Sequence, residues 1–583
     1  MGNCLNLPHL SKYKEGKALP IQTPFRLPSS LPTWPPGDGF ASGVIDLGGL
    51  LVRRISSFTK VWAAYEGGPD NLGTTFFEPS EVPQGFFSLG CYSQPNNRPL
   101  YGWVLVAKDD TTDSSLLAMP VDYTLVWSSE SLNIKKDGNA YFWLPTPPDG
   151  YKPIGHVVTN SPVKPSPDKI RCVRTDFTDE CESDTWIWGP QKDIKTTGFN
   201  VFSVRPSIRG SQAMGVCVGT FVAGNTNLAC LKNTKSDFSY MPNLPQIEVL
   251  FRAYAPWIYF HPDEKYFASS VSWFFMNGAL LYKKGEESNP VSIESTGSNL
   301  PQGGSNDGAY WLELPVDGGE ESNPVSIEPT GSNLPQGGSN DGAYWLDLPV
   351  DGGEKERVKR GDLSSSQAYL HVKPMLGATF TDIAVWVFYP FNGPARAKVE
   401  FVNVDLGKIG EHVGDWEHVT LRISNFNGEL CSVYFSKHSG GSWFSSSELE
   451  FQGGNKPVSY ASLHGHAMYS KPGLVLQGSG NIGIRNDTAK SKMLMDTGGQ
   501  FSVVAADHLG STVTEPPWLN YFREWGPKIN YNIEGEIKKV VKILPGKLKS
   551  AFEKFVKSLP KEVLGEEGPT GPKLKRNWNG DEV

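Results

Sequence analysis

Apolar side chains along this chain fall in short runs that end at glycine or proline. Two of these runs are typical: residues 382–389 are almost wholly apolar, and residues 419–423 alternate between apolar and polar. Short runs rich in β-branched and aromatic residues predict strands. Long stretches with helical periodicity are nearly absent before residue 519, and 62 Gly and 45 Pro supply turns. The pattern predicts a mainly β protein.

A weak triple repeat occupies residues 70–235. Its units are 76–90, 141–155 and 201–215, and each holds an apolar run, a proline-containing turn and two glycines five residues apart. The units recur at spacings of 65 and 60 residues. One such sheet cannot bury its apolar face alone, whereas three packed around an axis can. We therefore predict a pseudo-threefold β-prism over 51–245 after a leader over 1–50; the alternative is coincidence in a glycine- and proline-rich chain.

Residues 285–318 recur almost verbatim at 319–352, and only Ser295/Pro329 and Glu313/Asp347 differ. Two copies are too few for a solenoid. We expect one copy to supply a strand at 343–348 or its equivalent, and the other to be a loop-like insertion, since long loops cost little extra closure entropy. The sequence leaves open which copy pairs in the sheet.

Strand candidates on both sides of the duplication predict a β-sandwich over 246–530. Residues 534–558 turn basic and helical, which predicts a short helical and flexible tail over 531–583. The apolar positions Val540, Val541, Ile543 and Leu544 can lie on a membrane surface or dock as a helix pair on the sandwich. Both interpretations stay open.

Composition narrows the classes of function. The 583 residues carry a net charge of −8, which gives no basic field for nucleic acid. No window approaches 18 consecutive apolar residues, so we expect no transmembrane helix. The N-terminus lacks a basic region followed by an apolar run, so we expect no secretory signal peptide. Seven scattered cysteines do not form a disulfide pattern, which favours a reducing, cytoplasmic location.

The first residues suggest lipid attachment. Gly2 is a candidate for myristoylation and Cys4 for palmitoylation, and two lipids would hold a protein on a membrane where one is marginal. Asn6 departs from the Ser or Thr of the usual motif. An unmodified start is the alternative.

The richest chemistry lies in His412–His418, which holds two imidazoles and two carboxylates in seven residues. In an extended strand Asp415 and Glu417 share one face, and Trp416 and His418 share the other. His412 can reach the acids if Gly414 makes a bend. Two adjacent carboxylates need a positive partner, so we expect a divalent cation, Mg²⁺ or Ca²⁺, held by His412, Asp415 and Glu417. The alternative is carboxylates that face water or make plain hydrogen bonds.

Five of the ten histidines fall in this region: His412, His418, His438, His464 and His466. His464 and His466 alternate on a candidate strand, which would place both rings on one face. We expect His464 and His466 to line a ligand site together with Trp416 and His418, although core hydrogen bonds explain the His464–His466 pair equally well.

Several long motifs resemble one family across nearly the whole chain. The segments 254–264, 299–304, 389–394 and 410–418 are similar to those of the plant vacuolar protein sorting-associated protein 62 family. The resemblance implies a role in vacuolar traffic and says little about mechanism.

A more distant resemblance concerns the second half. Segments 385–390, 412–417 and 436–441 resemble the necrosis- and ethylene-inducing cytolysins. That likeness implies a cytolysin/lectin-like β-sandwich in which His412, Asp415 and Glu417 hold a divalent cation, His438 lines the pocket, and sphingolipid head groups bind. Gly414 stands where that family has a second histidine, and Asp405 is a candidate additional ligand.

These observations predict a peripheral membrane protein rather than an enzyme. The expected partners are sphingolipid- or phosphoinositide-type head groups or glycans, with homo-oligomers on endosomal, vacuolar or plasma membranes. The alternatives are a membrane-damaging defence protein and, at lower rank, a metal-dependent hydrolase that uses His412, Asp415, Glu417 and His438. No nucleophile elbow, P-loop or HExxH motif is present.

Overall fold

The computed structural model describes residues 21, 23–191, 193–194, 198–283, 325–340, 344–349, 352–438, 440–479, 481–527, 532–556, 559 and 569–582. The predicted mainly β fold is confirmed, because the chain forms many antiparallel sheets and few helices. The chain divides into two compact units. Unit 1 comprises Met1–Leu27, Gly43–Ile208 and Met214–Ser236; unit 2 comprises Pro28–Ser42, Arg209–Ala213 and Asp237–Val583. Gly2 and Cys4 lie outside the described residues.

Unit 1 is built from small sheets in two sets of three. The first set has the orders β3-β4-β6, β9-β10-β12 and β14-β15-β17, and the second has β1-β2-β7-β5, β8-β13-β11 and β14-β18-β16. The long strand β14 belongs to both sets, so its two sheets join into one five-stranded sheet, β16-β18-β14-β15-β17. The strands are β1 (Val44–Asp46), β2 (Leu50–Ile55), β3 (Phe58–Ala64), β4 (Thr74–Pro79), β5 (Phe87–Ser88), β6 (Tyr92–Pro95), β7 (Val104–Asp109), β8 (Leu117–Ala118), β9 (Asp122–Ser128), β10 (Tyr141–Thr146), β11 (Tyr151–Lys152), β12 (Val157–Thr159), β13 (Cys172–Arg174), β14 (Thr178–Trp188), β15 (Val201–Pro206), β16 (Gly215–Val216), β17 (Phe221–Ala223) and β18 (Ala229–Lys232).

The three repeat units meet at one point. Gly90 and Gly155 lie against each other and against the methyl group of Thr220. Backbone carbonyls of equivalent residues accept hydrogen bonds from the neighbouring unit: Ser88 from Arg171 (3.0 Å), Pro153 from Ala229 (3.1 Å) and Val218 from Leu105 (2.9 Å). This cyclic pattern is the pseudo-threefold arrangement that the triple repeat predicts.

The register of the third unit differs from the sequence-based prediction. The accepting carbonyls of Ser88, Pro153 and Val218 are spaced by 65 residues in both intervals, not 65 and 60. Gly215 therefore corresponds to Gly85 and Gly150, and Thr220 replaces the second glycine. The spacing differs because the loop between β15 and β16 is longer than the loops between β4 and β5 and between β10 and β11. The first glycine of the third unit, Gly210, therefore falls within the longer loop.

Aromatic rings fill the centre of unit 1. Trp62, Phe76, Phe142 and Trp188 are fully buried and pack mostly edge to face, with Phe76 and Phe142 centroids 4.8 Å apart. The aromatic runs of the repeat thus supply the core, and each large ring removes about 150–250 Å² of surface from water.

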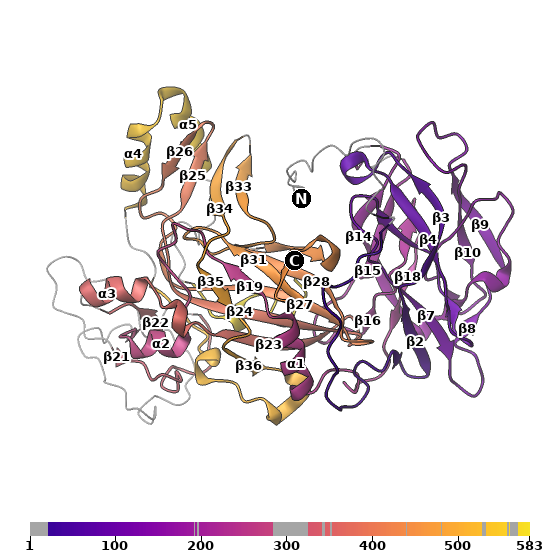
Figure 1. Ribbon diagram of the computed structural model, residues 1–583, viewed down its shortest axis with the longest axis horizontal. Helices are drawn as coiled ribbons and strands as arrows, with labels where there is room; N and C mark the ends of the chain where they lie inside the picture. Colours follow the sequence, from indigo (N-terminus) through magenta and orange to yellow (C-terminus); the bar gives the residue numbers. More distant parts are fainter. Residues whose placement is uncertain are drawn as a thin grey trace. The chain divides into compact units, whose positions relative to one another are not determined.

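A six-stranded sheet organises unit 2 (Figure 1), with the order β29-β28-β27-β24-β23-β36. The strands are β23 (Ala368–Met375), β24 (Phe380–Asn392), β27 (His412–Ser424), β28 (Leu430–Lys437), β29 (Gly440–Ser445) and β36 (Phe501–Ala505). Strands β24 and β27 are 13 residues each and place Tyr389 opposite Asp415 and Val387 opposite Glu417. The motif 412–418 therefore lies within a central strand.

Further sheets and helices complete unit 2. One sheet has the order β30-β31-β19-β35, with β32 paired to β31, and contacts the Tyr389 face through Phe260, whose ring centroid lies 6.3 Å from that of Tyr389. The others are β26-β25-β34-β33 and β21-β20-β22. Their strands are β19 (Trp257–Tyr259), β20 (Leu280–Lys283), β21 (Val325–Ser326), β22 (Tyr344–Asp347), β25 (Arg396–Val399), β26 (Val402–Asp405), β30 (Phe451–Gln452), β31 (Lys456–Ala461), β32 (Met468–Tyr469), β33 (Gly473–Ser479), β34 (Ile482–Thr488) and β35 (Leu494–Asp496). The helices are α1 (Leu244–Tyr254), α2 (Val271–Met276), α3 (Gly352–Lys359), α4 (Ile533–Ile543) and α5 (Gly546–Val556).

The second copy of the duplication supplies strands to a sheet of unit 2. Its residues form β21 and β22, which pair on either side of β20. The first copy, 285–318, lies outside the described residues. The copy at 319–352 thus pairs in a sheet, which the sequence alone did not decide.

Helices α4 and α5 dock on the sheet of β25 and β34. Val540, Leu544, Phe552 and Val556 are buried in one cluster with Ala397, Val399 and Ile484. The apolar stripe of the tail is thus used inside unit 2, which favours the docked helix pair over the membrane-surface interpretation. Across the described residues, none of the helices has the length and apolar character needed to span a bilayer.

Candidate functional site

Strand β27 separates the motif onto two faces, as the period of two predicts. Asp415 and Glu417 lie on the face that carries Tyr389, where His466 and Ser436 contact them. Trp416 and His418 lie on the opposite face, against Phe388 and Trp386. The two halves of the motif therefore belong to different sites.

Trp416 is a core residue. Its ring packs against Phe388, Tyr369, Trp518 and Trp525 with centroids 5.1–5.8 Å apart. The side chain is buried. The structure places it among aromatic rings in the apolar interior.

His418 belongs to a buried polar network on the same face. Its Nε2 lies 3.2 Å from Glu582 and 2.9 Å from the Asn577 amide, and its ring stacks near Trp386. Glu582 also accepts a hydrogen bond from Thr420 at 2.6 Å. These partners could not be predicted from the motif, because they lie more than 150 residues away along the chain.

Asp415 and His466 form a buried ion pair on the other face. Asp415 Oδ2 lies 3.0 Å from His466 Nδ1, and His466 Nε2 donates to the Tyr266 carbonyl at 2.8 Å. Burial opposes both charges, but the hydrogen bond and the neighbouring charges raise the pKa of His466 and lower the pKa of Asp415. The positive partner that Asp415 needs is therefore a protonated imidazole.

Glu264 extends this pair from the preceding sheet. Its carboxylate accepts hydrogen bonds from the backbone N–H groups of Lys265, Tyr266 and His464, and lies 3.3 Å from His464 Nδ1. Burial would raise its pKa, but these hydrogen bonds and the charge of His466 lower the pKa of Glu264 to about 2. Glu264 and Asp415 thus flank His466 with two negative charges.

Tyr389 and Glu417 complete the cluster. The Ser436 hydroxyl donates to Glu417. The Tyr389 hydroxyl is buried and has no hydrogen-bond partner, and burial together with the charges of Asp415, Glu417 and Glu264 raises its pKa well above the ordinary value. We call Glu264, Tyr389, Asp415, Glu417 and His466 the acid–histidine cluster.

His412 bends back on its own strand instead of joining the acids. Gly414 adopts φ +65°, as a bend requires, and His412 Nδ1 lies 3.0 Å from the Gly414 carbonyl. Burial lowers the pKa of His412 although Asp415 is near. The expected bend is present, but the imidazole contacts backbone.

The turn between β31 and β32 is strained at the cluster. His464 and His466 adopt φ +67° and +52°, in a region that non-glycine residues rarely occupy. The expectation of a strand with both rings on one face is wrong, because Gly465 stands in a tight turn and not in a strand. Such strain costs roughly 1–3 kcal/mol per residue and clusters at functional sites.

The remaining candidates lie elsewhere. Asp405 is on β26, paired with Arg396 at 3.2 Å, and its side chain is 82% exposed. His438 follows β28 with φ +55°, and its Nε2 lies 3.1 Å from the Asn486 amide oxygen. The structure shows no contact of either residue with Asp415.

The three expected metal ligands do not converge. His412 faces a backbone carbonyl, Asp415 is paired with His466, and Glu417 accepts from Ser436. Among the described residues, no group of three or more His, Cys, Asp or Glu side chains is placed as metal ligands would be. The arrangement present does not fit a preformed cation site.

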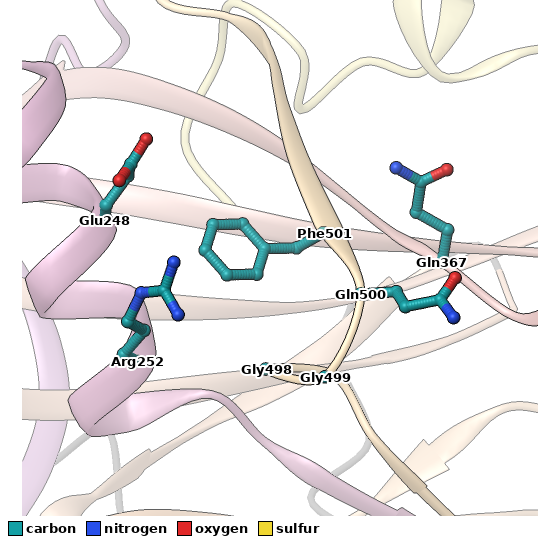
Figure 2. A pocket seen from close by; sticks show the side chains of 7 residues that line it. All are labelled: Glu248, Arg252, Gln367, Gly498, Gly499, Gln500 and Phe501. Carbon is teal, nitrogen blue, oxygen red and sulfur yellow. The ribbon is translucent and has the colours of Figure 1, made fainter.

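A separate open groove of about 410 Å³ lies between α1 and the start of β36. Figure 2 shows Glu248 and Arg252 projecting from the helix beside Phe501, with Gln367 and Gln500 on the other side. The Arg252 guanidinium lies 5.5 Å from the Phe501 ring centroid. No pattern in the sequence indicates this groove, because its residues are scattered over more than 250 positions and carry no motif.

Comparison with known proteins identifies one family. The model of the family described as vacuolar protein sorting-associated protein 62 matches residues 21–322 and 317–582. Among curated proteins, none matches the chain.

Solved structures give weak likenesses only. The crystal structure of GNIP1Aa from Chromobacterium piscinae is 17% identical, with a TM-score of 0.26 over 35% of this chain and 40% of GNIP1Aa. NLPPya in complex with glucosamine is 14% identical, with a TM-score of 0.16 over 31% of this chain and 70% of NLPPya; its mannosamine complex is 15% identical, with a TM-score of 0.15 over the same shares. This chain spans less than half the length of GNIP1Aa. At TM-scores below 0.5 these likenesses do not establish a shared fold.

Proposed function

The chain belongs to the vacuolar protein sorting-associated protein 62 family, and we propose that it is a peripheral membrane protein of vacuolar and endosomal traffic. In this proposal, unit 2 binds sugar- or phosphate-bearing head groups through the acid–histidine cluster. The chain would work from the cytoplasmic side of endosomal, vacuolar or plasma membranes.

One observation carries the proposal. A strained turn pairs His466 with Asp415 under the further influence of the Glu264 charge, and the ring stacks on Tyr389, whose buried hydroxyl has no hydrogen-bond partner. Each of these features costs stability: the strain, the buried charges and the orphaned hydroxyl. Several features that each lower the stability of the fold and lie close together are typical of a binding site.

The proposal is for a binding protein and not for an enzyme. His466 faces two acceptors, Asp415 and the Tyr266 carbonyl, which favour its protonated form, and an imidazole in that form is not available as a general base. Hydroxyl-rich ligands suit such a cluster, because charged acids and an unpaired phenol supply both acceptors and a donor.

A divalent cation, Mg²⁺ or Ca²⁺, remains part of the proposal in a restricted sense. Carboxylate oxygens from Asp415 and Glu417 are ligands that these cations prefer. Binding would require Asp415 to exchange His466 for the ion. Head-group binding that persists in chelator would remove the cation and leave the rest of the proposal standing.

Vesicle flotation tests the function. Phosphatidylcholine vesicles alone, with glucosylceramide, and with phosphatidylinositol 3-phosphate separate sugar recognition from phosphate recognition. We expect the full chain to float with one of the two loaded vesicles, and Asp415→Asn to weaken this about tenfold, as losing about 1.4 kcal/mol would. Asp405→Asn is the matched control, since that acid is exposed on another sheet.

Two outcomes would count against the proposal. Equal flotation of Asp415→Asn and the wild type would remove the acid–histidine cluster from binding. Release of an entrapped dye from the same vesicles would favour the membrane-damaging defence protein instead of simple docking.

A further inference from the structure

The segment Thr570–Glu582, which we call the strap, packs on the face of the six-stranded sheet opposite the acid–histidine cluster. Trp578 stacks on His371 with ring centroids 3.7 Å apart and planes within 10°. The Trp578 side chain is almost fully buried. The strap therefore has an aromatic anchor in a fitted position.

Two carboxylates of the strap contact a basic and polar surface, which we call the floor. The floor consists of Arg209, Lys373, Asp382, His418, Thr420 and Arg422. Asp581 pairs with Arg422 at 2.7 Å and with Arg209 at 2.9 Å. Glu582 accepts from Thr420 at 2.6 Å and lies 3.2 Å from His418 Nε2. Only 3% of the surface of Glu582 is exposed.

The floor also recognises the strap backbone. The Lys373 ammonium, 2% exposed, donates to the carbonyls of Asn577 and Gly580. Asp382 is the acid of the floor and makes a two-pronged pair with Arg422. Lys373, Arg422 and Arg209 against Asp382 leave an excess of positive charge that the strap acids neutralise.

The positive charge of the floor favours a covering segment that carries acidic side chains. Buried cations without partners are costly, so the face is stable only under a segment that supplies acids and backbone carbonyls. An apolar segment could fill the ring position of Trp578. It would remove Asp581 from Arg422, which would keep Asp382 as its partner. The hydrogen bonds from Lys373 go to strap carbonyls, which another backbone could supply only in the same position.

The chemistry on both sides matches a Trp-x-x-Asp-Glu segment, in which the ring is the anchor and the two acids enter the floor. The match lies in residues 578–582, because Lys573, Lys575 and Arg576 make the strap as a whole slightly basic.

We propose that this face of β23, β24 and β27 is a receptor for peptide segments that contain the pattern Trp-x-x-Asp-Glu, and that the strap is its ligand in cis. A protein segment of the same pattern, supplied in trans, would displace the strap. The proposal does not rest on the head-group site, which lies on the other face of the sheet.

Peptide binding to the full chain tests the receptor. The probe is a fluorescein-labelled peptide with the sequence of residues 571–582. The full-length variant Trp578→Ala/Asp581→Asn/Glu582→Gln, which empties the face, should bind it at least about tenfold more tightly than the wild type, whose face is occupied. The same peptide with Asn and Gln in place of its two acids should not compete. Adding Arg422→Gln should abolish the gain, and Asp405→Asn alone should give none.

A second measurement covers the case in which that variant does not fold. A protease site introduced between residues 560 and 568 allows the strap of an otherwise unaltered chain to be cut from the rest. The cut strap should co-elute with the chain and exchange for labelled peptide. The proposal is overturned if the folded variant gains no peptide affinity, or if the cut strap cannot be exchanged for free peptide.

Discussion

The rings of Tyr389 and His466 stack face to face, with centroids 3.9 Å apart and planes within 5°. The stack fixes the imidazole plane, so that Nδ1 points at Asp415 and Nε2 at the Tyr266 carbonyl. Two acceptors on one imidazole favour its protonated form, in which both nitrogens donate. Tyr389 positions the charge yet leaves its own hydroxyl without a partner.

Removing the charge of Asp415 should destabilise unit 2. Asp415→Asn leaves His466 buried beside a neutral amide, and breaking a buried pair in this way costs about 3–5 kcal/mol. Urea unfolding followed by tryptophan fluorescence measures the loss. Asp405→Asn is expected to leave the unfolding midpoint where it is, and equal midpoints for the two variants would contradict the buried ion pair.

The contribution of Glu264 should vanish in acid. Its pKa is lowered from 4.5 to about 2 in the folded chain, so the stability it contributes is fully present above pH 4.5 and is lost as pH falls toward 2. The difference corresponds to about 3 kcal/mol. The gap in unfolding free energy between wild type and Glu264→Gln should therefore be widest near pH 6 and shrink below pH 4. A gap that stays constant from pH 6 to pH 3 would show that Glu264 is not held ionised.

The opposite sign applies to His466. Its pKa is raised on folding, so its contribution is complete below its unfolded value near 6.5 and is lost as pH rises through the folded value. His466→Gln should consequently cost less stability at pH 9 than at pH 6. The ¹⁵N chemical shifts of the His466 ring provide a direct check, because both nitrogens should report protonation at neutral pH.

Tyr389→Phe should separate stability from binding. The substitution removes a buried hydroxyl that makes no hydrogen bond and keeps the ring that stacks on His466. We expect the free energy of unfolding to stay level or rise by about 1 kcal/mol. If the hydroxyl serves a head group, vesicle binding should fall at the same time; a variant that is less stable and binds normally would show that the hydroxyl has an internal partner.

The local part of the site could be predicted from the sequence. A period of two suffices to place Asp415 and Glu417 together and Trp416 on the other face. The bend at Gly414 also follows from its residue type. These features depend on neighbours within a few positions, which is the range over which side-chain alternation and backbone preference act.

The partners could not be predicted in the same way. His466 reaches Asp415 across 51 residues because a left-handed turn, and not a strand, aims its ring. Glu582 reaches His418 across 164 residues through the strap. The motif alone predicts a cation, because the positive partner of Asp415 is His466, which lies outside the motif and is brought to it by the fold.

The axis of unit 1 should tolerate no side chain at Gly90. A Cβ there would lie 2.7 Å from the Gly155 Cα, with φ +155° adding strain. Gly150→Ala is the matched control, because its φ is +82° but nothing lies within 4 Å of the added carbon. Gly150→Ala should cost about 1–2 kcal/mol from backbone strain alone, and Gly90→Ala clearly more in the same thermal unfolding experiment. Equal costs would argue against close packing of the three repeats.

Deleting one copy of the duplication should leave unit 2 intact. The second copy supplies both β21 and β22, which pair with β20, so removal of residues 285–318 takes away no described strand. The chain loses 34 residues of connection, and loop length changes closure entropy by only about 0.6 kcal/mol per doubling. We expect the shortened chain to unfold within a few degrees of the wild type, since about 1 kcal/mol moves the midpoint by about 2–4 °C at this size.

Because the copies differ only at Ser295/Pro329 and Glu313/Asp347, deletion of 319–352 gives nearly the same product and should behave alike. A large loss of stability in both deletions would show that the first copy has a structural role of its own.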